Sequence, residues 1–369
     1  MDRIAVRGSA LERVYQYGRQ ASRHIHRCVA AYRDAFQHRA SLEWEDALAQ
    51  ARGYRRDIEA FCPDALQEMT GIADGAELPF DVILLLNCRS ELMFAGARRK
   101  GAPVPCECTS FAVTPQASAD GHMLLGQNWD WVPFAREVCV LLEVHREDKP
   151  AYATIVEAGM LAKVGFNAAG LGVCTNTLVS ERDAGARGVP YHVMLRALFD
   201  AASMDEARSL LHAPKRALSA NYLLAHASGE AANFETIAGG PGEVRTTLPH
   251  AGLLAHSNHF LAEEFASIDA YVANSPHSVT RLADMWTGLR SHAQRTVSQM
   301  QRILRSHEHA PNGVCSHPDP AAHPLYARCT VASVITDLTA GEMLFTDGPP
   351  CTAAYEAYSL PAAGCAIAT

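Results

Sequence analysis

The stretch Cys106-Glu107-Cys108-Thr109-Ser110-Phe111 lies where the chain changes from one sequence texture to another. Residues 98–107 bring together three basic side chains, a glycine and two prolines, which is typical of an exposed linker. Residues 109–113 then have the β-branched and aromatic content of a strand. Cys108 therefore opens the first strand of a β-rich region, directly after an exposed loop.

The position of Cys108 suggests a chemical use for its thiol. If the bond between Glu107 and Cys108 is cut, the thiol and a new α-amino group lie on the same residue. An α-amino group has an ordinary pKa of about 7.7–8.0, so it can take the thiol proton as a general base near neutral pH. This gives an activated nucleophile without a separate histidine. The plain alternative is a buried strand cysteine.

Helical periodicity dominates the residues before the linker. Apolar residues recur at helical spacing over residues 9–36, Ser41 is a candidate cap for a second helix, and Pro63 suits the first turn of a third. A fourth helix is expected over residues 79–91, and because it is apolar on nearly all sides it should be buried. We expect residues 1–100 to be helical.

Short strands dominate the residues after the linker, with helices among them. The composition predicts helices over residues 191–202, 204–211, 278–289 and 291–306. Strands are predicted over residues 109–113, 122–125, 138–144, 151–156, 171–177, 221–225, 232–237, 244–247, 252–255, 330–337 and 342–345. This order predicts a layered α+β fold in which sheets lie between helices.

Composition excludes several classes of protein. The 369 residues are 48% hydrophobic and 20% charged, which is too apolar for a disordered chain. The formal net charge of −8 provides no global basic field, so we expect no nucleic-acid partner. We find neither a secretory signal nor a run of about 18 apolar residues, and so expect no membrane association. Eleven scattered cysteines do not fit a disulfide scaffold, and they predict a reduced, cytoplasmic protein.

Common catalytic motifs are absent from the chain. It has no phosphate-binding glycine loop, no dinucleotide fingerprint, no Gly-x-Ser-x-Gly elbow and no His-Glu-x-x-His. Two groups of histidines are conceivable zinc ligands, but neither has paired spacing with cysteine or carboxylate support, so we interpret both as exposed loop residues. These groups are His307, His309, His317 and His323, and His256 with His259. We therefore expect no metal site.

Several motifs in sequence order resemble a known family. Cys108-Thr109-Ser110 is followed by Gly126-Gln127-Asn128-Trp129-Asp130, and later by Lys163-Val164-Gly165-Phe166-Asn167, Asn176-Thr177-Leu178 and His256-Ser257-Asn258-His259. Together they resemble the acyl-coenzyme A:6-aminopenicillanic acid acyltransferase (isopenicillin N acyltransferase) family of autoproteolytic N-terminal nucleophile cysteine enzymes. The resemblance spans roughly residues 8–260, and more weakly residues 328–345.

The resemblance implies a fold and a set of residue roles. The fold would be the αββα four-layer sandwich of N-terminal nucleophile hydrolases, with a helical segment over residues 1–107 and a catalytic domain over residues 108–369. Cys108 would cleave the chain after Glu107 and then act as the nucleophile, Asp130 would orient the new amino terminus, and Asn258 would donate to the oxyanion. The remaining candidates are substrate or support residues: Ser110, Asn128 and Asn176.

The implied reaction is acyl transfer through a cysteine thioester. The substrate would be a small acyl amide or an acyl-CoA, the acceptor water or an amine, and no metal or organic cofactor is needed. The two cleaved chains would stay associated. The chain departs from the family pattern in two places, one bearing on cleavage and the other on the substrate. Glu107 stands where a glycine is expected, and Cys315-Ser316-His317 stands where an arginine segment is expected. Gln127 stands where the related bile-salt hydrolase and penicillin V acylase branch has arginine, which favours the acyltransferase branch.

Two other functions remain open on sequence grounds. One is an uncleaved, non-catalytic small-molecule-binding protein with the same fold. The other is a conventional cysteine hydrolase in which Cys108 stays internal and is paired with one of the seventeen histidines.

Overall fold

The computed structural model describes residues 1–99, 107–273, 275–320 and 327–361. Their strands form two sheets. The eight-stranded sheet has the order β1-β4-β5-β6-β7-β8-β9-β10, and the six-stranded sheet has the order β11-β2-β3-β12-β13-β14. The strands are β1 (Asp2–Val6), β2 (Glu107–Val113), β3 (Leu124–Trp131), β4 (Cys139–Val144), β5 (Tyr152–Glu157), β6 (Val164–Asn167), β7 (Leu171–Thr177), β8 (Ala220–His226), β9 (Ala231–Thr236), β10 (Val244–Thr247), β11 (Leu253–His256), β12 (Cys329–Asp337), β13 (Glu342–Phe345) and β14 (Glu356–Ser359).

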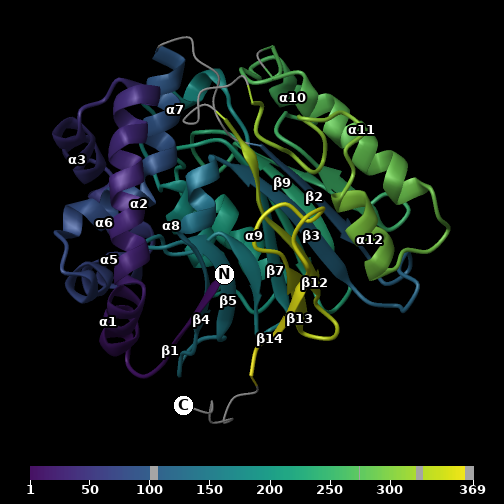
Figure 1. Ribbon diagram of the computed structural model, residues 1–369, viewed down its shortest axis with the longest axis horizontal. Helices are drawn as coiled ribbons and strands as arrows, with labels where there is room; N and C mark the ends of the chain where they lie inside the picture. The colour runs from purple at the N-terminus through teal and green to yellow at the C-terminus, as the bar shows by residue number, and fades with distance from the viewer. Residues whose placement is uncertain (100–106, 274, 321–326, 362–369) are drawn as a thin grey trace.

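Helices lie on both outer sides of this pair of sheets (Figure 1). The first seven come before the linker: α1 (Ala10–Gln20), α2 (Ser22–Ala35), α3 (Trp44–Arg52), α4 (Arg55–Phe61), α5 (Pro63–Ala76), α6 (Phe80–Asn87) and α7 (Arg89–Arg99). The others are α8 (Tyr191–Leu198), α9 (Met204–His212), α10 (Glu263–Ala266), α11 (His277–Arg290) and α12 (Val297–Leu304). Short 3₁₀ or π turns add η1 (Phe36–Ala40), η2 (Pro133–Glu137) and η3 (Glu181–Asp183).

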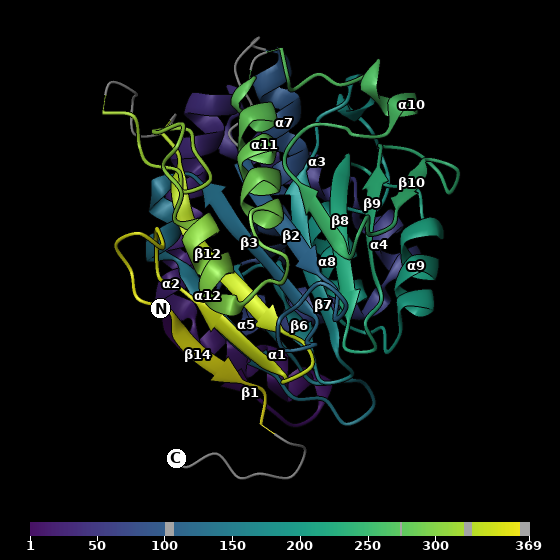
Figure 2. The same cartoon turned by 90° about the vertical axis from the view of Figure 1, so that its right-hand side faces the viewer.

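The arrangement has four layers. The early helices and α8 cover the eight-stranded sheet, and the two sheets pack on each other through β2 and β3 against β7. Figure 2 shows α11 and α12 lying across the six-stranded sheet, which they contact at β2, β11, β3 and β12. The predicted αββα four-layer sandwich is therefore confirmed.

The amino-terminal segment is not wholly helical. Residues Asp2–Val6 form β1, which pairs in parallel with β4 and so places this segment at the edge of the larger sheet. The helix expected over residues 9–36 is divided at Ala21, where the backbone has φ −91° and ψ 3°. Pro63 is in the first turn of α5, as expected, but Ser41 does not cap α3: it has a left-handed backbone, φ 47°, and Glu43 is the residue before that helix.

Most predicted strands lie within two residues of their observed positions. The predicted limits of β10 and β13 match the structure, whereas the short strands β6 and β14 were missed. The predicted helix over residues 291–306 is shorter in the structure, because α12 begins only at Val297, where Thr296 caps it. Among the described residues, every helix is too short or too polar to span a bilayer.

The strand that begins at Cys108 occupies a central place. β2 lies between β11 and β3, and its register pairs Cys108 with Trp129 and Ser110 with both Gln127 and His256. Strand alternation turns Cys108 and Ser110 toward the larger sheet and Thr109 toward α11. The amino-terminal end of β2 is thus enclosed by both sheets and by a helix, which positions the candidate site.

Candidate active site

Cys108 is buried at the second position of β2, with 4% of its surface exposed. Its thiol interacts electrostatically with Cys174 of β7, which places it between the two sheets. The backbone N–H of Asp130 donates to the sulfur. The thiol is therefore held in a dry position beside a strand pair, not in a mobile loop.

The backbone nitrogen of Cys108 has a dedicated partner. It donates to Asn258 Oδ1 at 2.7 Å. Asn258 follows β11, the strand beside β2, so the sheet order itself brings the two residues together. Asn258 Oδ1 also accepts from Arg281 Nη2 at 3.0 Å, while Asn258 Nδ2 donates to the Thr177 carbonyl at 2.9 Å. Two donors on one side and a carbonyl on the other fix which amide atom is oxygen.

This orientation bears on the oxyanion role expected for Asn258. The side-chain oxygen, not the amide nitrogen, faces the Cys108 nitrogen. One N–H of Nδ2 is used by Thr177. Because a side-chain amide nitrogen carries two N–H groups, Asn258 Nδ2 has a second N–H, and this is the group that would donate to an oxyanion.

Arg281 was missed by the sequence analysis and lies at the centre of the site. It is fully buried on α11 and donates through Nη1 to the Cys108 carbonyl and to Thr109 Oγ1, both at 2.8 Å. With its bond to Asn258, one guanidinium therefore fixes Cys108 and the group that holds its nitrogen. Helical spacing predicts its burial, since residue 281 falls on the same face as the apolar positions 282, 285 and 289, but it does not place the side chain beside Cys108.

Asp130 is buried on β3, directly opposite Glu107 in the ladder. Its Oδ1 accepts from Thr330 Oγ1 of β12 at 2.6 Å. The carboxylate charge lies close enough to Cys108 to act on the pKa of its thiol. The fold thus brings Asp130 close to Cys108, as expected, and the Thr330 hydroxyl fixes the orientation of the Asp130 side chain.

A second cation missed by the sequence analysis lies near the thiol. The ammonium of Lys163 is 4.6 Å from the centre of the Trp129 ring and 5.4 Å from that of Tyr191. Burial raises the pKa of the Cys108 thiol to about 11, and Asp130 also raises it, whereas Lys163 and Arg281 lower it. In the continuous chain the thiol is therefore protonated near neutral pH.

The three support candidates have structural partners. Ser110 Oγ donates to Asn176 Oδ1 at 2.7 Å, and Asn221 Nδ2 donates to the same oxygen at 3.1 Å, so Ser110 and Asn176 belong to a polar network between the sheets. Asn128 points the other way. Its Nδ2 donates to the carbonyls of Leu304 and Val314, both at 2.8 Å, and so ties the last residue of α12 to a point within the segment that follows it.

A family model matches this site and its surroundings. Residues 117–324 match the family described as acyl-coenzyme A:6-aminopenicillanic acid acyl-transferase. This range is more than half of the chain and includes Asp130, Lys163, Asn258 and Arg281. The chain belongs to this acyl-transferase family. The match begins at residue 117 and so does not include Cys108.

A curated relative gives the same result. The chain is 29% identical over 208 residues to the 40 kDa form of acyl-coenzyme A:6-aminopenicillanic-acid acyltransferase of Emericella nidulans. The aligned part covers 55% of this chain and 54% of the relative, so the chain spans about half the length of the curated relative that it matches.

Solved structures resemble this chain more distantly. Penicillin V acylase from Agrobacterium tumefaciens is 16% identical, with a TM-score of 0.43 over 65% of this chain and 83% of that one. A variant of conjugated bile acid hydrolase from Clostridium perfringens is 12% identical, with a TM-score of 0.45 over 68% of this chain and 97% of that one.

Gln127 and the two departures from the acyl-transferase family pattern have defined places in the fold. Gln127 is fully buried and bonds both backbone groups of Thr175, so it joins the two sheets. The segment Cys315-Ser316-His317 runs beside β12, where the Ser316 N–H donates to Thr330 Oγ1 at 3.0 Å. Only the backbone of Glu107 is described, as part of β2. Cys106 and His323 lie outside the described residues.

Proposed function

We propose that the chain is an autoproteolytic enzyme that cleaves itself between Glu107 and Cys108 and then transfers or hydrolyses an acyl group through a Cys108 thioester. The observation that carries this proposal is the bond from the Cys108 nitrogen to Asn258 Oδ1, at 2.7 Å. After cleavage this nitrogen is an amine that can keep the same acceptor while its lone pair faces the thiol. Asn258 therefore already orients, in the uncleaved chain, the nitrogen that becomes the base after cleavage.

The environment of the thiol supports the amine as the base. The thiol is protonated in the continuous chain, because burial raises its pKa to about 11. In the part of the chain that the structure describes, the groups that act most strongly on this thiol are Lys163, Asp130 and Arg281, and none is a histidine. His256, near in sequence to Asn258, is occupied by Glu235 at 2.8 Å. A conventional cysteine–histidine pair is therefore disfavoured.

The cleavage step follows from this arrangement. The Cys108 sulfur attacks the Glu107 carbonyl carbon, the bond from that carbon to the Cys108 nitrogen breaks, and the thiol proton passes to the leaving nitrogen. This leaves residues 1–107 attached to the sulfur as a thioester, which water hydrolyses to a carboxylate and a free thiol. Arg281 fixes the Cys108 carbonyl at 2.8 Å and so holds the residue still during attack.

The mature enzyme would repeat the same chemistry on a small substrate. The amine takes the thiol proton, and the sulfur attacks an acyl amide or an acyl-CoA. The oxyanion that forms can accept from the second N–H of Asn258 Nδ2, in the field of Lys163. Water or an amine then takes the acyl group. No metal or organic cofactor enters these steps.

Cleavage is tested on the purified full chain. Denaturing electrophoresis should show fragments of about 12 and 28 kDa from the 39.9 kDa chain, and amino-terminal sequencing of the larger one should begin Cys-Thr-Ser-Phe. Cys108→Ala should leave one chain. Cys106→Ala is the matched control, because it removes the other linker thiol and should be processed normally.

Other outcomes separate the alternatives. A wild-type chain that stays intact and reacts with no acyl substrate would mean an uncleaved binding protein. An intact chain that hydrolyses acyl amides through Cys108 would mean a conventional cysteine hydrolase. Cleavage that persists in Cys108→Ala would exclude self-processing by this thiol.

A further inference from the structure

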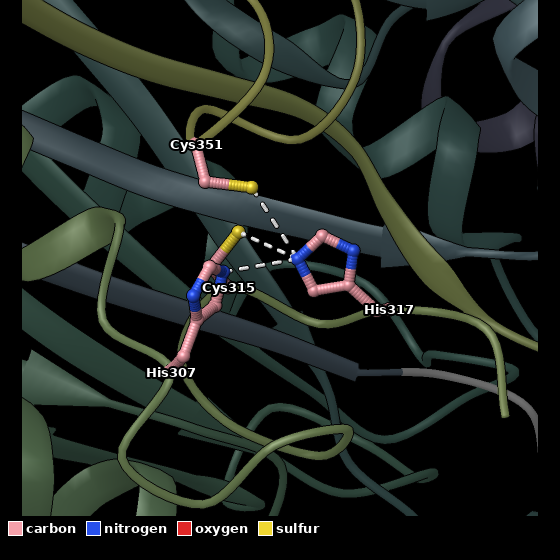
Figure 3. A group of neighbouring side chains, drawn as sticks. All are labelled: His307, Cys315, His317 and Cys351. Atoms are coloured by element: carbon pink, nitrogen blue, oxygen red, sulfur yellow. Dashed lines mark hydrogen bonds between the residues drawn. The ribbon is translucent and has the colours of Figure 1, made fainter.

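Four side chains with metal-binding atoms meet in one cluster (Figure 3). They are His307, Cys315, His317 and Cys351, and their ligand atoms all lie within 4.8 Å of one another. The first three come from the segment between α12 and β12, and Cys351 comes from the turn between β13 and β14. No cysteine stands at zinc-finger spacing from these histidines in the sequence, and the fold brings two cysteines to them.

The separations fit a tetrahedral ion. Zinc binds sulfur at about 2.3 Å and imidazole nitrogen at about 2.0–2.1 Å, so its ligands lie about 3.3 Å apart for two nitrogens and about 3.6 Å apart for nitrogen and sulfur. His307 Nε2 and His317 Nε2 are 3.0 Å apart. His317 Nε2 is 3.6 Å from the sulfur of Cys315 and 3.4 Å from that of Cys351.

Hydrogen bonding alone does not explain this cluster. His317 Nε2 has three close neighbours, His307 Nε2, Cys315 Sγ and Cys351 Sγ. A ring nitrogen carries either one hydrogen or one lone pair, so it can make only one of these hydrogen bonds well. All three contacts are explained if the four atoms point at a common centre.

We propose that these four side chains bind a divalent transition-metal ion, zinc above all, as a Cys₂His₂ site. Each cysteine would lose its proton on binding and each imidazole would be neutral, so the bound ion displaces two protons and the site is electrically neutral. Four protein ligands leave no open position for substrate, which makes the site structural. It is separate from the acyl-transfer steps and does not rest on the proposed function.

The surroundings indicate what such an ion would hold together. The Cys315 N–H donates to the Ser306 carbonyl and the His317 N–H to the Pro311 carbonyl, both at 3.0 Å, so the ligand loop has a defined backbone. An ion would link this loop to the turn that carries Cys351.

That link reaches the active site through a short path. Between two of the ligands, Ser316 donates its N–H to Thr330 Oγ1, and the Thr330 hydroxyl donates to Asp130. Two hydrogen bonds therefore connect the ligand loop to Asp130. Solvent can reach the cluster, because His307 is exposed and Cys351 is half-buried. A chelator could therefore remove a bound ion.

The experiment measures metal in the full chain carrying Cys108→Ala, which stays uncleaved and isolates the site from any processing. After loading with zinc and removal of excess ion, elemental analysis should give close to one equivalent per chain. Cobalt(II) in place of zinc should give thiolate-to-cobalt charge-transfer absorption and the visible bands of tetrahedral cobalt. Removal of zinc by a chelator should lower the melting temperature.

Ligand variants have matched controls in the same region. Cys315→Ser, Cys351→Ser and His307→Ala should each weaken zinc binding by more than the roughly 10–100-fold that loss of a supporting residue costs. His309→Ala is the control, because His309 lies in the same loop but bonds Asp284 at 2.7 Å instead. Cys62→Ser controls for loss of a thiol elsewhere, between α4 and α5.

Three results would overturn the proposal. These are a loaded chain with no retained metal, retained metal that all three ligand variants keep, and a Cys315–Cys351 disulfide found by peptide mass spectrometry in protein purified under reducing conditions. Each variant is first shown to fold by its circular dichroism spectrum, so that lost metal is not mistaken for lost structure.

Discussion

At the scale of single residues, Asn258 has two chemical ends with different tasks. Its oxygen accepts from the Cys108 nitrogen and from Arg281, and its amide nitrogen is the proposed donor to the oxyanion. Asn258→Asp keeps an acceptor beside both donors and removes the N–H groups. Asn258→Ala removes both ends and leaves the buried Arg281 without one of its acceptors.

We expect the two variants to separate these tasks. Asn258→Asp should still be processed at Glu107–Cys108, whereas its kcat on an acyl amide or acyl-CoA should fall by about 10²–10³-fold, the usual effect of losing one oxyanion donor. Asn258→Ala should impair processing as well. The measurements are the processed fraction over time and kcat of the mature enzyme. Normal turnover in Asn258→Asp would exclude the donor role and leave only the positioning role.

At the scale of secondary-structure elements, the contact between α7 and α8 includes the buried carboxyl group of Glu91. Glu91 Oε1 accepts from the Tyr191 N–H, the first residue of α8, at 2.7 Å. Burial raises the pKa of Glu91 from 4.5 to about 7. The folded chain therefore holds this proton more tightly than the unfolded chain. The resulting stability is fully present below about pH 4.5 and is lost as the pH rises through 7.

Glu91→Gln should remove this pH dependence, because glutamine keeps the acceptor and has no charge to bury. Relative to the variant, the parent chain should lose up to about 3 kcal/mol of unfolding free energy between pH 5 and pH 8. Urea unfolding of Cys108→Ala chains at both pH values measures this difference. The exposed Glu59→Gln is the control. An equal pH dependence in Glu91→Gln and its parent would mean that Glu91 stays ionised in the fold.

The local sequence pattern predicted the positions of most helices and strands well, but it predicted poorly which of them pack against one another. β10 and β13 were placed correctly because strand composition and nearby glycines mark both limits. β1 was missed because it is short, precedes strong helical periodicity, and finds its partner β4 more than 130 residues later. Cys108, Asp130 and Asn258 lie in sequence motifs and could be named in advance. Arg281 and the cluster that includes Cys315 and Cys351 lie in no such motif, and only the packing of α11 and of two loops brings them into place.

At the scale of the whole molecule, the helical segment and the rest of the chain share a buried network. Arg89 of α7 pairs with Glu157 of β5, and both are at most 1% exposed. The guanidinium lies 4.4 Å from the centre of the Trp131 ring, and Trp131 Nε1 donates to the Tyr32 hydroxyl at 2.9 Å. Tyr32 in turn donates to Glu157. Residues on both sides of the proposed cleavage point thus supply one another's buried ion-pair and hydrogen-bond partners, so we propose that the two fragments stay together.

Arg89→Met tests whether this network holds the two parts together. The change leaves the Glu157 carboxylate buried without its cation, which should cost about 3–5 kcal/mol of unfolding free energy, whereas Arg52→Met breaks an exposed pair with Asp81 and should cost about 0–1 kcal/mol. The double variant Arg89→Met/Glu157→Met removes both charges and should recover much of the loss, because the stranded charge, not the missing pair, is what destabilises the fold. The free energies are measured by urea unfolding of the uncleaved Cys108→Ala chain. Size-exclusion chromatography of the processed protein then shows whether the fragments co-elute. If Arg89→Met costs no more than Arg52→Met and its fragments still co-elute, the two parts are held mainly by the apolar packing of the helices and by β1 at the sheet edge.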